Sequence, residues 1–389
     1  MPLSRRAFVR VLGAGGAGAL LAGRGAGGHG PFWRDLLGEP LLAAADRRIL
    51  LHNNENPLGP GEAVLDAVRA ALRGGPMAGR YPGNFDALGR AIADAQGVAP
   101  ENILTGCGST QLLRTAVQVF TSPMRPLLTG DPSYEECTGY ARLIGSPVRT
   151  VPADAKLRHD LKAIAAAAKG AGLIFVDNPS NPTATVWSDE AVRELIERAL
   201  AVSPDTTIMI DEAYHDYVTD PAYKSQVQAA ARNPRVVVAR TFSKAHGMAG
   251  LRVGYVVSHP DTIRKMRAWD GGGAMNLLGI AGATASLKDP ARIERERERN
   301  TEARRFTIQW FERAGFTGTD SQTNFLFVNL QRPARPFREA CREQGVLVAR
   351  DFPPFENSHC RISIGTMEEM REATGVFGKV LGVAAAAAA

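Results

Sequence analysis

Residues 236–255 read VVVARTFSKAHGMAGLRVGY, a stretch in which an apolar run leads directly into closely spaced polar side chains. The run at 236–239 is typical of a buried strand. The residues after it therefore emerge at the carboxyl end of a strand, where open α/β sheets bind their ligands. The stretch predicts an α/β protein with Ser243, Lys244 and Arg252 at a functional site.

These three side chains suit a cofactor that carries both an aldehyde and a phosphate. A partly desolvated lysine amine attacks aldehydes, so Lys244 is the candidate nucleophile. A hydroxyl and the fixed fork of guanidinium donors bind phosphate, which suits Ser243 and Arg252. Pyridoxal 5'-phosphate has both groups. In the alternative interpretation, Lys244 is a surface amine and Arg252 forms a salt bridge.

A second apolar run, at 207–210, ends in Asp211, and Tyr214 follows three residues later. A carboxylate facing the pyridine nitrogen would keep that nitrogen protonated, and the protonated ring withdraws electrons from a breaking Cα–H bond. Asp211 is the candidate for this role, and Tyr214 is a candidate donor to the phenolic oxygen of the ring. The alternative is a helix-capping aspartate beside a core tyrosine.

Residues 103–111, ILTGCGSTQ, lead from a predicted strand into a helical pattern at 112–120. The free N–H groups of a first helical turn face an anion and favour it by only ~0.3 to 2 kcal/mol. The glycine loop would therefore position a phosphate, and the arginine and lysine would secure the cofactor.

Together these segments resemble the fold-type I aminotransferases, and the SKA and AGLRVG wording is similar to the histidinol-phosphate aminotransferase branch. The resemblance extends over residues 50–383. It implies a large domain, whose mostly parallel sheet is sandwiched by helices, and a smaller α/β domain. It also implies that Lys244 bonds the cofactor covalently and then carries the proton between the substrate carbon and the cofactor carbon.

The resemblance implies a further set of cofactor contacts. Phosphate binding falls to Gly108, Ser109, Thr110, Ser243 and Arg252, with Tyr81 reaching the phosphate of a partner subunit. Tyr134 would stack on the ring, and Asn181 would bond its phenolic oxygen beside Tyr214. Because Tyr81 acts across a subunit interface, a homodimer is expected.

Three residues are candidates for binding the substrate. Arg361 lies in a short alternating pattern at 360–366, and a bidentate guanidinium holds an α-carboxylate with ~1.5 to 3 kcal/mol. The resemblance places Arg350 at a distal substrate phosphate and Asn56 in the substrate loop, NNENPLGP at 53–60. An exposed strand-edge arginine is the alternative for Arg361.

Three positions depart from the branch pattern. Ala184 stands in place of a glycine, Thr110 and Gln111 in place of an Asp-Glu pair, and Leu58 in place of a common tyrosine. If the glycine is needed for a positive φ, alanine would shift the loop slightly. Leucine cannot hydrogen-bond a substrate, and losing one polar contact can change the preferred substrate by more than about tenfold.

The chain begins with SRRAFVR at 4–10, followed by an apolar, glycine-rich run at 11–22. This start resembles a twin-arginine export signal, because the run is shorter than the ~20 residues that span a bilayer and positive charge precedes it. The twin-arginine machinery carries folded proteins, so we expect cofactor loading in the cytoplasm and then export. A basic amphipathic helix or a misassigned start codon is the alternative.

Composition fits a globular enzyme, with 44% hydrophobic and 22% charged residues. The net charge of +6 comes mainly from residues 1–30, which hold four arginines and no acids, so 42 basic residues face 40 acidic ones afterwards. Nucleic-acid binding gains no support from this balance. The four cysteines show neither metal spacing nor a disulfide framework.

The expected domain organisation follows from these segments. It comprises the export signal at 1–30, a linker at 31–45, an amino-terminal part of the small domain at 46–75, the large cofactor-binding domain at 76–290, the small carboxy-terminal domain at 291–383 and an alanine tail at 384–389. Residues 291–313 predict one long exposed helix.

The sequence thus predicts a homodimeric pyridoxal-phosphate aminotransferase. It would move an amino group between an amino acid or a histidinol-phosphate-like amino phosphate and a 2-oxo acid. A decarboxylase or lyase of the same fold is the alternative, because the ring stabilises whichever carbanion the site exposes. A transcription regulator is disfavoured because residues 1–45 show no helix-turn-helix pattern. An exported protein that binds the cofactor without turnover is the remaining non-enzyme hypothesis.

Overall fold

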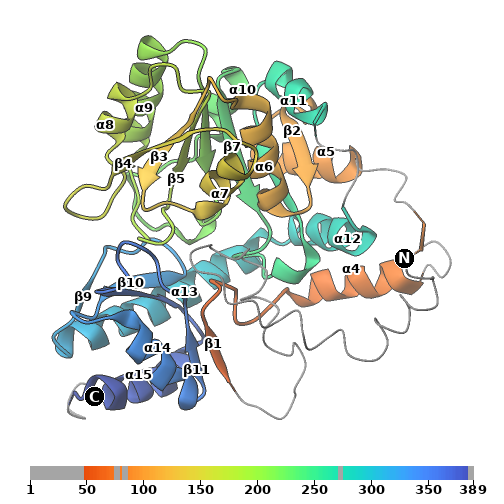
Figure 1. The fold of residues 1–389 in the computed structure, drawn as a ribbon. Coiled ribbons are helices and arrows are strands. Elements are labelled where there is room, and N and C mark those ends of the chain that lie inside the picture. The colour runs from red at the N-terminus through yellow and green to blue at the C-terminus, as the bar shows by residue number, and fades with distance from the viewer. Residues whose placement is uncertain (1–47, 74–78, 81–85, 270–274, 384–389) are drawn as a thin grey trace, which may run out of the picture. The chain divides into compact units, whose positions relative to one another are not determined.

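The computed structural model describes residues 48–73, 79–80, 86–269 and 275–383 (Figure 1). The predicted export signal, the linker, Tyr81 and the alanine tail lie outside the described residues. The chain from Arg48 onward forms one compact unit.

A seven-stranded sheet organises the chain from residue 103 to residue 257. Its order is β2 (Ile103–Gly106), β8 (Gly254–Val257), β7 (Val236–Thr241), β6 (Thr207–Asp211), β5 (Leu173–Asp177), β3 (Leu127–Asp131) and β4 (Val148–Pro152). Only β8 runs antiparallel to its two neighbours, and the other pairs are parallel. The predicted α/β fold with a mostly parallel sheet is confirmed.

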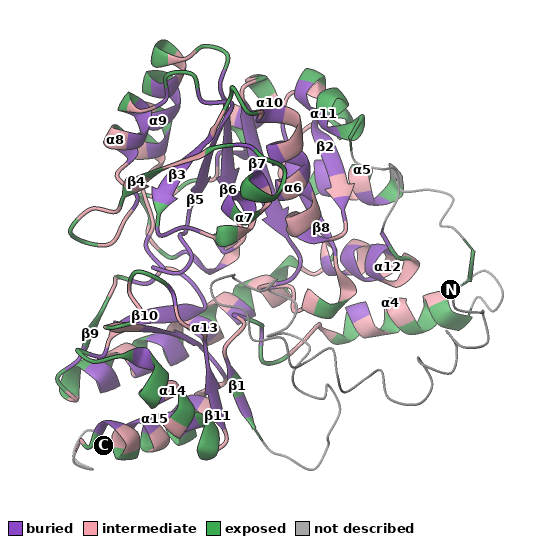
Figure 2. Cartoon of the chain, viewed as in Figure 1, coloured by how far each residue is buried: buried purple, intermediate pink, exposed green. Residues whose placement is uncertain are grey.

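Helices cover both faces of this sheet, which explains why its central strands are apolar throughout. On β5, Leu173 and Phe175 belong to one hydrophobic cluster, whereas Ile174 and Val176 belong to another, because successive side chains point to opposite faces. One face packs on α6 (Gly108–Phe120), α7 (Glu135–Leu143) and α11 (Pro260–Arg267), and the other on α5 (Asp86–Gln96), α8 (Leu161–Ala166), α9 (Asp189–Val202), α10 (Val227–Arg232) and α12 (Leu277–Ser286). The central strands are buried in Figure 2.

The carboxy-terminal part has its own core. An antiparallel sheet of β12 (His359–Ser363), β10 (Phe325–Asn329) and β9 (Thr317–Gly318) lies with a parallel pair, β1 (Ile49–Leu51) and β11 (Val346–Val348). Helices α13 (Pro290–Arg313), α14 (Ala334–Glu343) and α15 (Met367–Leu381) cover this core. β1 therefore joins this part, whereas α4 (Glu62–Arg73) packs against α12.

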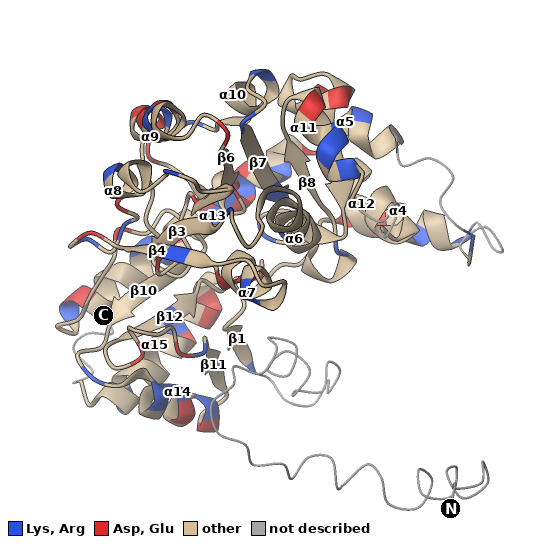
Figure 3. Cartoon of the chain, turned by 45° about the horizontal axis from the view of Figure 1, so that its top comes forward, with Lys and Arg blue, Asp and Glu red and all other residues tan. Residues whose placement is uncertain are grey.

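The predicted long helix at 291–313 is present as α13, but the expectation that it is exposed is wrong for one of its faces. Ala303, Trp310 and Phe311 enter the carboxy-terminal core. This buried face could not be recognised from the sequence because it includes a charged residue. Glu296 is buried, and it forms an ion pair with Arg299 at 2.8 Å. Acidic and basic residues are mixed along α9 and α13 (Figure 3).

Three short 3-10 turns complete the described elements, η2 (Pro100–Asn102), η3 (His215–Tyr217) and η4 (Ala249–Leu251). Among the described residues, none of the helices combines the length and the apolar composition that crossing a membrane requires.

Candidate functional site

The candidate site forms where three neighbouring strands end. Asp177, the last residue of β5, lies opposite Asp211, the last residue of β6, and Asp211 lies opposite Ala239 of β7. The segment that carries Lys244 begins just beyond β7. Parallel pairing thus brings chemical groups from distant parts of the sequence to one edge of the sheet.

Lys244 is partly buried at this edge. Its Nζ donates a hydrogen bond to the carbonyl oxygen of Asn53 at 3.1 Å and lies 5.5 Å from the centre of the Tyr214 ring. Burial, together with the positive charge of Arg361, lowers the pKa of Lys244 to about 8. More of this amine is therefore unprotonated near neutral pH than for an ordinary lysine, and the unprotonated amine is the form that attacks an aldehyde.

Ser243, Arg252 and the start of α6 form a cradle for an anion. Arg252 Nη1 donates to Ser243 Oγ at 3.3 Å, and among the described residues no carboxylate forms an ion pair with Arg252. Gly108 has a φ of +74°, and a Cβ at this position would collide with the Arg252 guanidinium. Ser109 and Thr110 belong to the first turn of α6, whose N-cap residue makes no side-chain cap. These features fit a phosphate.

Asp211 is a buried carboxylate without a cation bonded to it among the described residues. It accepts one hydrogen bond, from the N–H of Ala213 at 3.1 Å, and is 4% exposed. Burial, followed by the negative charge of Asp177, raises the pKa of Asp211 to about 7. Such a group would gain from a cationic partner, and the protonated ring nitrogen of pyridoxal phosphate is one. Asp211 does not cap η3, whose N-cap is Tyr214.

Tyr214 is held beside Lys244 by a residue that sequence reasoning missed. Asn54 Nδ2 donates to the Tyr214 hydroxyl at 3.1 Å, while Asn54 itself is fixed by Ser363 of β12 through two hydrogen bonds of 2.8 Å. Burial raises the pKa of Tyr214 to about 12, so the phenol keeps its proton. With its oxygen already accepting from Asn54, the hydroxyl can donate into the site, as proposed for the phenolic oxygen of the cofactor.

Arg361 and Asn181 meet although 180 residues separate them. Arg361 Nη1 donates to Asn181 Oδ1 at 2.7 Å and Nη2 to the His52 carbonyl oxygen at 2.8 Å. Its Nε is buried and has no hydrogen-bond partner within the described part of the chain. Burial lowers the pKa of Arg361 to about 10. A buried guanidinium with an unused donor is suited to bind a carboxylate.

Arg350 and Arg361 lie near the same aromatic ring, that of Phe352. The guanidinium carbons of Arg350 and Arg361 lie 4.5 and 4.7 Å from the centre of the Phe352 ring. Arg350 also pairs with Glu135 at the start of α7, through Nη2 to Oε2 and through Nη1 to Oε1 at 3.4 Å. The predicted anchor for a distal anion therefore already has an acidic partner, which the sequence did not indicate.

Both polar groups of the Asn56 side chain are hydrogen-bonded to the backbone. Its Nδ2 donates to the Ala245 carbonyl oxygen at 2.9 Å, and its Oδ1 accepts from the N–H of Leu58 at 2.9 Å. Its contact with substrate stays a prediction. Leu58, which replaces the tyrosine common in the branch, is 59% exposed.

Ala184, at the position of the glycine in the branch pattern, has a left-handed backbone conformation. Its φ is +63°, and its side chain is buried in a cluster with Tyr214 and Phe325. Hydrogen bonds from its N–H to Ser180 and from the N–H of Gln322 to its carbonyl, both 2.9 Å, hold this geometry. An L-residue in the left-handed region costs about 1 to 2 kcal/mol, which these contacts offset.

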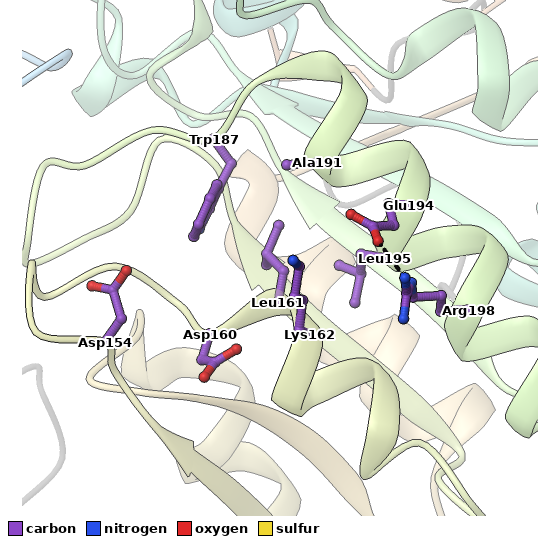
Figure 4. Close-up of a pocket in the computed structure, with 9 residues that line it drawn as sticks. All are labelled: Asp154, Asp160, Leu161, Lys162, Trp187, Ala191, Glu194, Leu195 and Arg198. Atoms are coloured by element: carbon purple, nitrogen blue, oxygen red, sulfur yellow. Dashed lines mark ion pairs between the residues drawn. The ribbon is translucent and has the colours of Figure 1, made fainter.

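Tyr134, the predicted stacking residue, precedes α7 and is partly buried. Its N–H donates to Asp177 Oδ2 at 3.1 Å. A separate surface cavity of about 300 Å³ lies between α8 and α9 around Trp187, and no predicted site residue lines it (Figure 4). We therefore place the function at the strand ends and not in that cavity.

The described residues fit pyridoxal phosphate. They supply a cradle for an anion, a buried carboxylate without a cation bonded to it, a neutral phenol and a lysine of low pKa, and each suits a different part of the cofactor. Of the predicted cofactor residues, only Tyr81 lies outside the described residues.

Comparison with known proteins gives consistent matches. Residues 47–377 match the family described as aminotransferase class I and II. The chain is 35% identical over 324 residues to a histidinol-phosphate aminotransferase of Moorella thermoacetica, covering 82% of each protein, and 33% identical over 336 residues to one of Symbiobacterium thermophilum, covering 86% of this chain and 91% of that protein. A histidinol-phosphate aminotransferase of Sinorhizobium meliloti, solved with pyridoxal-5'-phosphate, superposes with a TM-score of 0.79 at 27% identity, covering 86% of this chain and 91% of the other.

Proposed function

This chain belongs to the aminotransferase class I and II family and is a pyridoxal-phosphate-dependent aminotransferase, and from that premise we propose that its preferred amino donor carries a distal anion, as histidinol phosphate does. The observation that carries the proposal is the pair of guanidinium groups, Arg350 and Arg361, on the Phe352 ring. Two cations near one aromatic ring suit a substrate with more than one polar anchor.

The residues divide the chemistry among themselves. The cofactor, when bound, supplies an electron sink for the electrons of the broken Cα–H bond. Lys244 would take the proton from the substrate Cα and deliver it to the cofactor carbon. Asp211 would hold a proton on the ring nitrogen, Tyr214 would donate to the phenolic oxygen, and Arg361 would bind and orient the α-carboxylate of the substrate.

A half-reaction scan tests the donor. Purified protein with bound cofactor is mixed with histidinol phosphate and with single amino acids, and the absorbance change from the pyridoxal to the pyridoxamine form is recorded. Conversion by histidinol phosphate at the lowest concentration is expected. Conversion by other amino acids alone would move the substrate, and release of carbon dioxide would favour the lyase alternative.

Arg350 and Glu135 should control the affinity for the distal anion in opposite directions. Arg350→Gln is expected to raise the KM for histidinol phosphate by roughly 10- to 150-fold, because a charge-assisted hydrogen bond is worth about 1.5 to 3 kcal/mol. Glu135→Gln is expected to lower it by at most about fivefold, because an exposed ion pair contributes about 0.2 to 1 kcal/mol. Steady-state kinetics measure both effects.

Alanine as amino donor provides the control, since it has no distal group. Neither variant should change the KM for alanine by more than about twofold, because alanine does not reach Arg350 and the exposed Arg350–Glu135 ion pair contributes little to stability. An Arg350→Gln protein that still binds histidinol phosphate normally would contradict this assignment.

Cofactor capture by the cofactor-free protein should slow as the pH falls below about 8. Only the unprotonated Lys244 amine attacks the aldehyde, and burial lowers its pKa to about 8. The rate should therefore drop by about tenfold for each pH unit well below this value and level off above it. Stopped-flow absorbance measures the rate, with a free lysine derivative as control. A rate that keeps rising to pH 10 would mean an ordinary lysine pKa.

We also propose a homodimer and export by the twin-arginine route. The dimer is supported by the RYPG motif at 80–83, in which Tyr81 would reach the partner's cofactor phosphate, and export by SRRAFVR at 4–10. Light scattering and fractionation of cells that produce the full chain test the two proposals. A Tyr81→Phe variant should release the cofactor faster, and an Arg5→Lys, Arg6→Lys variant should stay in the cytoplasm.

A further inference from the structure

A buried histidine and carboxylate lie behind the cofactor contacts described above. His159, between β4 and α8, is 2% exposed, and Asp177, at the end of β5, is 3% exposed. Their contact joins His159 Nε2 to Asp177 Oδ1. We infer that His159 and Asp177 are positioning residues that fix the two segments gripping the cofactor ring, an inference that rests on the proposed function.

Asp177 bonds directly to both of these segments. Its Oδ2 accepts from the N–H of Tyr134 at 3.1 Å and from the N–H of Asn181 at 2.8 Å. Tyr134 carries the predicted stacking ring, and Asn181 carries the predicted ligand of the phenolic oxygen. One carboxylate therefore sets the position of a group over the ring face relative to a group at the ring edge, through charge-assisted bonds.

His159 holds that carboxylate in a single orientation. A side chain on Gly130 would collide with the His159 ring, so β3 closes one side of it. The His159 carbonyl oxygen accepts from Trp187 Nε1 at 2.9 Å, and the Trp187 N–H donates to Asn178 Oδ1 at 2.8 Å. Since a carboxylate accepts hydrogen bonds, His159 Nε2 is the donor in the contact with Asp177. His159 Nδ1 has no hydrogen-bond partner among the described residues.

The pair also reaches the substrate anchor. Asn181 accepts at Oδ1 from Arg361 Nη1 at 2.7 Å, so a shift of the Asn181 segment would move the guanidinium that holds the α-carboxylate. Loss of the pair should therefore act on catalysis as well as on cofactor binding. A merely structural pair would change neither once the protein is folded.

His159→Leu, in the cofactor-loaded protein, removes the donor and keeps a side chain of similar bulk. We expect kcat to fall by about 10- to 100-fold, because a small displacement of the groups that position the reactants lowers the rate by this much. The visible circular dichroism of the bound cofactor should change, and the cofactor should dissociate faster. His159→Gln, whose amide can donate toward Asp177, should restore most of the dichroism and of kcat.

Asp177→Asn decides the question if His159→Leu does not fold, because it keeps the volume and one acceptor oxygen. It should change the dichroism in the same way. Thr121→Val is the matched control, since Thr121 bonds Ser146 at 2.7 Å near the opposite ends of β3 and β4. It should lower stability and leave the dichroism unchanged.

Unchanged dichroism and dissociation rate in folded His159→Leu would overturn the inference. Failure of the wild-type protein to react with any anionic donor would instead refute the proposed substrate, while the dichroism still reports on the positioning pair.

Discussion

Replacing Lys244 by alanine is expected to lower kcat/KM for transamination by at least about 10²- to 10⁴-fold, the range that a positioned acid-base group contributes. Lys244 is the amine of low pKa at the strand ends, and among the described residues near Tyr214 it is the one placed to carry a proton across the ring. Single-turnover absorbance measures the loss. The cofactor should still bind non-covalently, because the Arg252 cradle and Asp211 remain.

Lys156→Ala is the matched control, because Lys156 is exposed and its one hydrogen bond to another described residue is donated by its main-chain N–H, to Asp154 Oδ1. It should keep wild-type activity. Partial rescue of Lys244→Ala by added methylamine would identify the missing group as an amine base. A Lys244→Ala protein with normal turnover would revive the hypothesis of a binding protein without chemistry.

Asp211→Asn should produce two effects of opposite sign. With cofactor bound, activity should fall by about 100- to 1000-fold, as for the loss of one preorganised electrostatic contact. Without cofactor, the variant should be more stable than the wild type at pH 8. The reason is that burial and Asp177 raise the pKa of Asp211 from 3.8 to about 7.

The sign follows from linkage. A carboxyl whose folded pKa is raised contributes stability that is fully present below the unfolded value of 3.8 and is lost as the pH rises through about 7. At pH 8 the cofactor-free wild type therefore carries a buried negative charge on Asp211. This charge lowers the free energy of unfolding by at most about 4 kcal/mol for a shift of this size, and asparagine does not carry it. Near pH 4 the difference should disappear.

Thermal unfolding of both proteins, with and without cofactor, at pH 4 and pH 8 measures these terms. Asp205→Asn, at a side chain that is 88% exposed, should change neither stability nor activity. Equal stabilities of cofactor-free Asp211→Asn and wild type at both pH values would show that the Asp211 carboxyl titrates normally.

The sheet and the cofactor residues on it could be predicted because both depend on local patterns. The apolar runs that became β5, β6 and β7 carry no polar alternation, as strands covered on both faces require. Once the strands are parallel, Asp211 and Lys244 must lie at the same edge. Register alone then places Asp177 beside Asp211.

Two of the contacts that sequence reasoning missed join segments far apart in the chain. Asn54 meets Tyr214 across 160 residues, and Arg350 meets Glu135 across 215. A single asparagine or glutamate belongs to no periodic pattern from which such a partner could be predicted. His159 has the same difficulty, because its role depends on Asp177 and on the close approach of Gly130, neither of which is visible before the fold is known.

The parallel pairing of β1 with β11 sets an order of events during synthesis. Ile49 pairs with Val346, and Arg361 donates to the carbonyl oxygen of His52. Residues near the start of the chain therefore form these contacts only after residues near its end have been synthesised. The sheet at 103–257 can assemble while the ribosome is still translating, since domains fold as units during synthesis. The loop that carries Asn54 can take its place only after the chain is nearly complete. For the proposed export route this means that the translocation machinery must receive a finished polypeptide, because a nascent one would have no closed site in which to keep its cofactor.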